Sequence, residues 1–429
     1  MNRIDIPAGY RPQNTASLKT YLGAIDQIRG RLSGRPEDWR IEEVGDGNLN
    51  LVFKVWGPAG GIAVKQALPY LRLVGESWPL PLSRAHFEQL ALQEQWRAAP
   101  GLVPALLHVD QSMALTVMEL LEPHIIMRRG MIEGRVYPRF IDDITTFAAQ
   151  THFRTSDLFL TADRKKLLVG TFAGNFELCK ITEDLVFTEP YIAAARNRWT
   201  TPQLDPYVTR FRADGDLKIA VSRLKLQFID HAQALIHGDL HTGSVMVTEG
   251  DTRIIDPEFA FVGPIGFDLG AVIGNLLLNY LAQDGHEDVP GARDSYREWV
   301  LGVVQAFWPE YRRKFLALWR EQGAGDAYPK AMFADAAGEE RLEIERAAYM
   351  ARLFGEMIGF AGVKMIRRIF GLAHNIDFEW IAEPARRASC EARAVTLARE
   401  MILGSAEIRG PGDLCDKARA LRNWNPPLG

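Results

Sequence analysis

Two short acidic segments, Ile236–His241 (IHGDLH) and Ile254–Glu258 (IIDPE), decide the fold that this sequence predicts. The stretches Val245–Val247 and Arg253–Ile255 have the composition of short β-strands. Between them, Glu249–Asp251 (EGD) has the composition of a tight turn. The region is therefore predicted to form a loop and a β-hairpin, with the second acidic segment directly after the hairpin.

The carboxylates of these segments suit phosphoryl transfer. Protein kinases place one aspartate in a catalytic loop, where it accepts the proton of the attacking hydroxyl, and a second where it binds Mg²⁺. Asp239 and Asp256 have that order and context, and Glu258 offers a further oxygen ligand to Mg²⁺. Ser244 stands where protein kinases have a metal-binding asparagine, and serine is the weaker ligand of the two.

Each of these residues also has a plain structural interpretation. A single aspartate in a loop often closes a turn or caps a helix, whereas two aspartates beside strands favour catalysis. His237 and His241 flank Asp239 and allow a zinc site, although His237 is more readily explained as a hydrogen-bonding brace of the loop. Asp268 opens a long apolar segment and is expected to cap or order that helix.

A β-rich region upstream carries candidate nucleotide ligands. The glycines of a turn before its first strand permit positive φ and close approach to phosphate, and an ordinary polar turn is the alternative. Lys65 ends a strand like the one whose lysine pairs with phosphates and with a helix glutamate in kinases, and Glu88 is preferred to Glu94 as its partner. The candidate nucleotide ligands are Gly45, Asp46, Gly47, Asn48, Asn50, Lys65, Glu88, Met118, Glu119 and Leu120. Met118, Glu119 and Leu120 would form a hinge that binds adenine.

Hydrophobic periodicity divides the chain near residue 120 and predicts an α+β, two-lobed protein-kinase-like fold. Residues 1–120 are expected to form a nucleotide-binding small lobe, with a helix over 16–31, an antiparallel sheet of two hairpins, and a helix over 84–98 capped by Ser83. Residues 121–429 are expected to form a mainly helical large lobe with the catalytic loop, the metal site and the substrate site. Its helices are predicted over 140–153, 216–235, 266–283, 292–307, 310–323, 339–370 and 384–403, with a partly disordered tail from Gly410.

Composition disfavours several other classes of protein. The chain has 429 residues, 24% of them charged, and a net charge of −4, which predicts neither nucleic acid nor an anionic membrane as a partner. Three cysteines without a CxxC pair argue against a disulfide framework, and together with the polar segment Met1–Tyr10 they predict a cytoplasmic protein. The apolar window Ile265–Ala282 contains one aspartate and two asparagines, so it is expected to be a buried core helix.

From about Val44 to Trp380 the sequence resembles the 5-methylthioribose kinases, within the aminoglycoside phosphotransferase and choline kinase group. Motifs spread along that length carry the resemblance. They are Gly45–Asn50 (GDGNLN) with Val64–Tyr70 (VKQALPY), Val74–Leu80 (VGESWPL), His237–Ser244 (HGDLHTGS), Asp256–Phe259 (DPEF), and Met365–Ile369 (MIRRI) with Gly371–His374 (GLAH).

The resemblance implies ATP-dependent phosphorylation of the C1 hydroxyl of 5-methylthioribose, a step of methionine salvage. It implies that Asp239 is the base beside the sugar and that Asp256 and Glu258 hold Mg²⁺. Ser244 matches the pattern of this group. Members of the group are commonly homodimers, so a homodimer that binds a small-molecule sugar is expected.

The resemblance also implies that Arg367 and Arg368 bind the substrate. Adjacent residues on a helix point about 100° apart. Helical geometry alone therefore predicts that at most one of the two arginines faces a shared spot, unless the helix ends there, as Gly371 would allow. A solvated, cationic last turn of a helix is the alternative interpretation of this pair.

Two other functions are consistent with the residues. The first is a related kinase acting on choline, homoserine or an aminoglycoside, but a site for choline needs an acidic or aromatic cage, and the arginine pair argues against cationic substrates. The second is a non-catalytic, nucleotide-binding regulator. Such a protein is expected to lack the lysine or one of the aspartates, whereas Lys65, Asp239 and Asp256 are all present.

Overall fold

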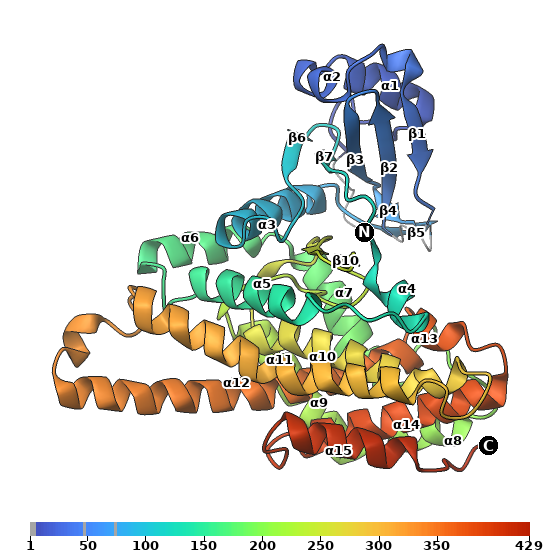
Figure 1. Ribbon diagram of the computed structural model, residues 1–429, viewed down its shortest axis with the longest axis vertical. Helices are drawn as coiled ribbons and strands as arrows, with labels where there is room; N and C mark the ends of the chain where they lie inside the picture. Colours follow the sequence, from blue (N-terminus) through green and yellow to red (C-terminus); the bar gives the residue numbers. More distant parts are fainter. Residues whose placement is uncertain (1–5, 46–48, 73–74) are drawn as a thin grey trace.

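The computed structural model describes residues 6–45, 49–72 and 75–429, and it has two lobes (Figure 1). The small lobe contains an antiparallel sheet in the order β1-β2-β3-β7-β6, and the large lobe is mainly helical. The predicted fold class is therefore confirmed. The strands of this sheet are β1 (Arg40–Glu43), β2 (Asn50–Gly57), β3 (Gly60–Ala67), β6 (Leu106–Asp110) and β7 (Leu115–Glu119).

One face of this sheet is covered by the two N-terminal helices, α1 (Thr15–Gly23) and α2 (Asp26–Leu32). Alternate residues of β2 and β3 point to one face, as the period of a strand requires, and pack on apolar residues of both helices. The prediction of one continuous helix over 16–31 was wrong. Ile25 has an extended backbone with φ −97° and ψ 106°, so the helix is interrupted, and both halves turn their apolar side chains to the sheet.

Helix α3 (Arg84–Ala98) has the predicted bounds, but its predicted cap is absent. Ser83 already has helical backbone angles, and its side chain makes no capping hydrogen bond. Arg84 begins this helix as a buried residue, and its guanidinium donates hydrogen bonds to the carbonyl oxygens of Leu68 and Leu49. The start of α3 is thus joined to the chain on either side of the β2–β3 hairpin.

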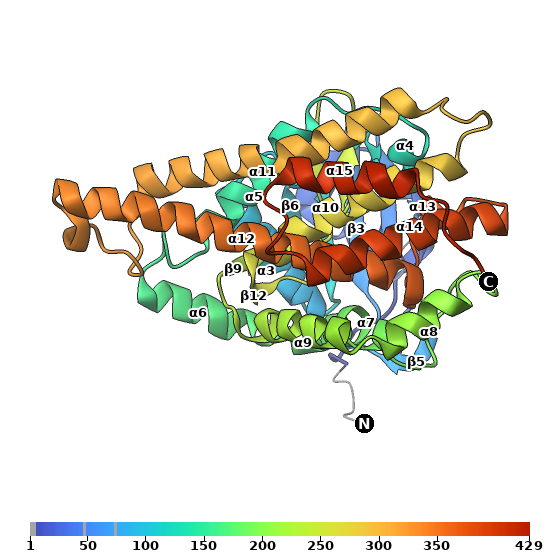
Figure 2. The same ribbon diagram turned by 90° about the horizontal axis from the view of Figure 1, so that it is seen from below.

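The large lobe consists of long helices around a few short strands. Its helices are α4 (Met127–Ile132), α5 (Phe140–Arg154), α6 (Ala162–Phe172), α7 (Phe176–Phe187), α8 (Asp205–Ala213), α9 (Gly215–Asp230), α10 (Ile265–Ala282), α11 (Asp294–Gln322), α12 (Ala336–Phe370), α13 (Ile376–Glu379), α14 (Pro384–Leu403) and α15 (Pro411–Arg422). Its strands are β8 (Ile125–Ile126), β9 (Ala234–Ile236), β10 (Val245–Val247), β11 (Thr252–Ile254) and β12 (Phe261–Gly263), whereas the short strands β4 (Tyr70–Leu71) and β5 (Gly75–Pro79) belong to the small lobe. Helices α9, α14 and α15 lie on the face away from the small lobe (Figure 2).

Three predictions for the large lobe were wrong about where a helix ends or whether a helix forms. Helix α11 continues through Pro309, because its apolar face stays buried on both sides of the proline, and that burial offsets the local loss of a hydrogen bond. The helix predicted over 216–235 ends at Asp230, after which the chain enters β9. The tail predicted to be partly disordered forms α15, which buries Leu414, Cys415 and Ala418.

Helix α10 is the centre of the large lobe, and every one of its residues is buried. It belongs to the one described segment, Ile265–Gly285, that is long and apolar enough to cross a membrane, and the apolar window of that segment is buried inside the protein. The prediction of a buried core helix is confirmed. A side chain at Gly270 would come within 2.7 Å of the Ala361 backbone, so glycine is required there for α10 and α12 to pack closely. This close packing brings the C-terminal half of α12 to the predicted catalytic loop, His237–Ser244, between β9 and β10.

Candidate active site

Helix α10 binds the catalytic loop between β9 and β10 through Asp268. Asp268 accepts hydrogen bonds from the backbone nitrogens of His237, at 2.6 Å, and Gly238, at 2.9 Å. The imidazole Nε2 of His237 in turn lies 2.9 Å from the carbonyl oxygen of Ile255, which connects the two acidic segments. His237 is therefore a brace of the loop, and Asp268 orders the loop as well as its own helix.

Four groups surround the carboxylate of Asp239. Oδ1 accepts a hydrogen bond from Nζ of Lys364 at 2.8 Å, and Oδ2 lies 3.1 Å from Nε2 of His241. A guanidinium nitrogen of Arg367 is 3.7 Å from Oδ1, and one of Arg368 is 3.8 Å from Oδ2. Burial alone would raise the pKa of Asp239, but His241, Lys364 and Arg367 outweigh burial and hold that pKa well below its ordinary value.

His241 acts on Asp239 as a neutral hydrogen-bond donor. Its Nδ1 accepts a hydrogen bond of 3.0 Å from the backbone nitrogen of Gly243, which leaves the proton on Nε2, the atom that faces Asp239. Burial lowers the pKa of His241 to about 3, so the ring stays neutral at physiological pH.

The two arginines of α12 both face Asp239. The expectation that at most one would do so without a helix break was wrong, because α12 continues to Phe370 and the two long side chains converge on different oxygens. Their side chains are only 11% and 8% exposed, so the pair is not a solvated helix end. The three cations bring concentrated positive charge to the catalytic loop.

A second charged group joins the two lobes. Nζ of Lys65 in β3 lies 2.8 Å from Oε1 of Glu88 in α3, contacts Asp256, and lies 3.8 Å from Glu258. Glu94, the alternative partner, instead pairs with Arg97 at the surface. Burial would lower the pKa of Lys65, but the surrounding carboxylates raise it, whereas burial raises the pKa of Glu88 to about 7.

The donor set of this group fits a divalent cation. Carboxylate oxygens of Glu88, Asp256 and Glu258 all lie within 4.8 Å of one another, and hard oxygen ligands are those that Mg²⁺ prefers. The side chain of Asp256 is 45% exposed and is thus accessible to a ligand. Its backbone has φ +69°, a left-handed conformation that aspartate tolerates better than most residues.

The remaining predicted site residues lie around these two groups. Ser244 donates a hydrogen bond of 2.9 Å to the carbonyl oxygen of Asp239, and its role as a metal ligand stays a prediction. Asn50 is buried and hydrogen-bonded to Glu258, and Gly45 is the last described residue before position 46. Met118 and Glu119 end β7, Leu120 follows them, and the predicted ligands Asp46, Gly47 and Asn48 lie outside the described residues.

Sequence reasoning missed two cations at this site. Lys364 contacts Asp239, and Arg128 of α4 donates hydrogen bonds to Thr242 in the catalytic loop and to Asn275 of α10. Lys364 could have been found, because residues three and four apart lie on the same face of a helix, and it stands at that spacing before the arginine pair. Nothing in the sequence near Arg128 indicates its place.

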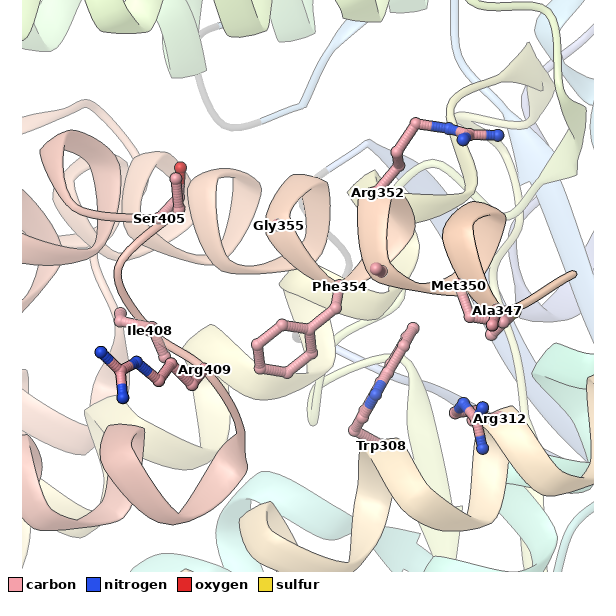
Figure 3. A pocket seen from close by; sticks show the side chains of 12 residues that line it. Trp308, Arg312, Ala347, Met350, Arg352, Phe354, Gly355, Ser405, Ile408 and Arg409 are labelled. Carbon is pink, nitrogen blue, oxygen red and sulfur yellow. The ribbon is translucent and has the colours of Figure 1, made fainter. Parts of the chain in front are cut away.

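A cavity of about 590 Å³ lies elsewhere, between α11, α12 and the segment after α14 (Figure 3). Trp308 and Phe354 form part of its apolar wall, and the side chains of Arg312, Arg352 and Arg409 surround it. None of the residues that line it belongs to either charged group described above.

A lysine–glutamate pair in the small lobe, in contact through its lysine with Asp256 of a large lobe that also carries Asp239, defines a phosphotransferase of the kinase type. The sequence profile of the phosphotransferase enzyme family matches residues 40–312. The chain is 43% identical over 409 residues to methylthioribose kinase 1 of Oryza sativa subsp. japonica, which covers 95% of this chain and 94% of that protein. It is 44% identical over 415 residues to the methylthioribose kinase of Escherichia coli O45:K1 (strain S88 / ExPEC), which covers 96% and 99%.

Among solved structures, a Plasmodium vivax ethanolamine kinase matches with a TM-score of 0.42 and 12% identity, over 88% of this chain and 89% of that one. The chain belongs to the phosphotransferase enzyme family and, within it, to the methylthioribose kinases.

Proposed function

We propose that this protein transfers the γ-phosphoryl group of ATP to the C1 hydroxyl of 5-methylthioribose and so forms 5-methylthioribose 1-phosphate. The observation that carries this proposal is 41–44% identity to methylthioribose kinases along most of the chain. The comparisons give no such support to choline, homoserine or an aminoglycoside as the acceptor, or to a non-catalytic regulator.

The nucleotide would bind between the lobes. Lys65, held by Glu88, would contact the α- and β-phosphates, as the corresponding lysine does in kinases. The turn Gly45–Asn50 would cover the phosphates, and the backbone of Met118–Leu120 would hydrogen-bond to adenine. Among the described residues, Asn50 begins β2, Lys65 lies in β3, and Met118 and Glu119 end β7.

Asp256 and Glu258 would hold Mg²⁺, with Ser244 as a further candidate ligand. When bound, this ion neutralises charge on the phosphates. Asn50 fixes Glu258 by a hydrogen bond of 2.7 Å, so one ligand is already oriented. Lys65 supplies positive charge among these carboxylates.

Asp239 would accept the proton of the attacking hydroxyl. A carboxylate with a depressed pKa can do so because, in a loose transition state, the hydroxyl loses its proton late, when the new P–O bond has begun to form. Arg367 and Arg368 would stabilise the negative charge that develops on the transferred phosphoryl oxygens and on the sugar oxygen.

We further propose a cytoplasmic homodimer that works in methionine salvage, with residues 1–120 as its nucleotide-binding lobe and residues 121–429 as its substrate-binding lobe. The net charge of −4 supports the expectation that neither nucleic acid nor a membrane is a partner.

The direct test is ATP consumption by the purified protein with 5-methylthioribose, choline, homoserine and an aminoglycoside in parallel, each with and without Mg²⁺. We expect Mg²⁺-dependent turnover with 5-methylthioribose alone, and a ³¹P NMR signal coupled to the anomeric proton of the product. Turnover only with another alcohol would refute the proposed substrate. ATP binding without turnover of any acceptor would refute the proposed catalysis.

A further inference from the structure

Three cations on one face of α12 approach Asp239, but they do so at different distances. Lys364, Arg367 and Arg368 have the spacing i, i+3 and i+4, which places them on the same side of the helix. Only Lys364 is within hydrogen-bond distance, at 2.8 Å, whereas the guanidinium nitrogens lie 3.7 and 3.8 Å away. The three side chains therefore do not hold the same relation to the carboxylate.

Lys364 is the most enclosed of the three. The residue is 2% exposed, and a buried ammonium group is tolerated only when it is paired. Its Nζ lies 3.5 Å from the carbonyl oxygen of Gly238 and 4.2 Å from the centre of the Phe267 ring. Among the described residues, Asp239 is the only carboxylate with which it forms an ion pair. The ammonium group of Lys364 thus has Asp239 as its anionic partner and packs against the face of the Phe267 ring.

Lys364 and His241 hold the carboxylate of Asp239 at two points. Lys364 donates to Oδ1, and the Nε2–H of His241 faces Oδ2. His241 is itself oriented by the backbone nitrogen of Gly243. Two donors on two oxygens fix both the position and the plane of the carboxylate, which is the condition that a general base must meet to reach a bound hydroxyl.

We infer that Lys364 is a positioning residue for the phosphoryl transfer: it holds Asp239 as the base, while Arg367 and Arg368 remain available to the phosphoryl oxygens. This inference rests on the proposed function. It assigns different roles to the three cations of α12. Lys364, the closest to Asp239, would orient the base, and it would not contact the transferred phosphoryl group.

A double-mutant cycle on kcat tests this role, using the Lys364→Met, Asp239→Asn and double variants. Asp239→Asn is expected to lower kcat by about a hundredfold. Lys364→Met should lower kcat roughly tenfold or more in the wild-type background and less than about twofold in the Asp239→Asn background, because its effect passes through Asp239. The KM for ATP should stay unchanged. Equal losses in both backgrounds would overturn the inference, since Lys364 would then act directly on substrate.

The same four proteins provide a test that needs no substrate. The shift in urea-unfolding midpoint caused by Lys364→Met should differ between the wild-type and Asp239→Asn backgrounds, and additive shifts would overturn the contact. Absence of wild-type turnover would instead overturn the proposed function, so the two failures are distinguishable. Lys364→Gln replaces Lys364→Met if the latter does not fold. Lys166→Met, at an exposed position of α6, is the matched control and should change neither kcat nor the midpoint.

Discussion

Asn50 of the small lobe donates a hydrogen bond of 2.7 Å from its Nδ2 atom to Oε2 of Glu258 in the large lobe. Both side chains are buried, and Oδ1 of Asn50 accepts a hydrogen bond of 2.9 Å from Arg84 at the start of α3. A strand of the small lobe is thereby bonded directly to a proposed Mg²⁺ ligand.

The Asn50→Ala variant is expected to lose this connection. Glu258 and Arg84 would each lose a buried partner, so the free energy of unfolding should fall by about 1–3 kcal/mol. The Mg²⁺ concentration at half-maximal activity should rise because Glu258 is no longer oriented. Urea unfolding and a Mg²⁺ titration of turnover measure the two effects, with Asn425→Ala at an exposed position as the control. An unchanged Mg²⁺ dependence would contradict the proposed role of Glu258.

The Gly238→Ala variant is expected to be strongly destabilised. Gly238 has φ +82°, and an added Cβ would lie 2.1 Å from the carbonyl oxygen of Phe259. The catalytic loop must then shift, at an expected loss of at least about 2 kcal/mol in the free energy of unfolding. The control is Gly250→Ala in the hairpin turn, where no atom lies within 4 Å of the added Cβ. Equal stability of the two variants in chemical denaturation would contradict the left-handed backbone and close contact at Gly238.

The Asp256→Ala variant is expected to abolish Mg²⁺-dependent turnover. The mutation removes a proposed ligand and also a carboxylate partner of Lys65, which keeps Glu88 as its other close partner. The protein should therefore still fold, and circular dichroism against temperature checks this. Activity is measured across a range of Mg²⁺ concentrations, with Asp163→Ala at an exposed helical position as the control. Retention of the wild-type Mg²⁺ response would exclude Asp256 as a ligand.

Turnover is expected to decline as the pH rises through about 8. Burial, together with the nearby charges of Arg367 and Arg368, lowers the pKa of Lys364 to about 8 despite the attraction of Asp239. Arg128, neutral His241 and the carboxylate of Asp256 also interact with Asp239. Below this pH the ammonium form predominates and holds Asp239, whereas above it the neutral amine holds Asp239 less well.

The measurement for this prediction is kcat against pH from 6 to about 10, for the wild type and for Lys364→Met. The decline near pH 8 should disappear in the variant, whose activity is already low. An identical alkaline decline in both proteins would assign it to a different group.

Local patterns were sufficient for the elements that carry the chemistry. The hairpin of β10 and β11, helix α3 and the strand with Lys65 follow from alternation, turn composition and short-range spacing, and the structure confirms them. Elements whose bounds depend on burial were predicted less well. Pro309 lies inside α11, and the interruption at Ile25 divides α1 from α2, because packing against neighbouring elements outweighs local preference at both places.

The class of chemistry follows from residue types and their order along the chain. The two acidic segments and Lys65 appear in kinase order, and their side chains have the oxygens and the charge that phosphoryl transfer needs. The set of groups that contact Asp239 depends instead on long-range packing. Lys364 is far from Asp239 in sequence, and it reaches the carboxylate because α10 and α12 pack closely at Gly270. This contact depends on how α10 and α12 pack against each other. No local pattern around Lys364 or around Asp239 predicts how far apart the two side chains lie.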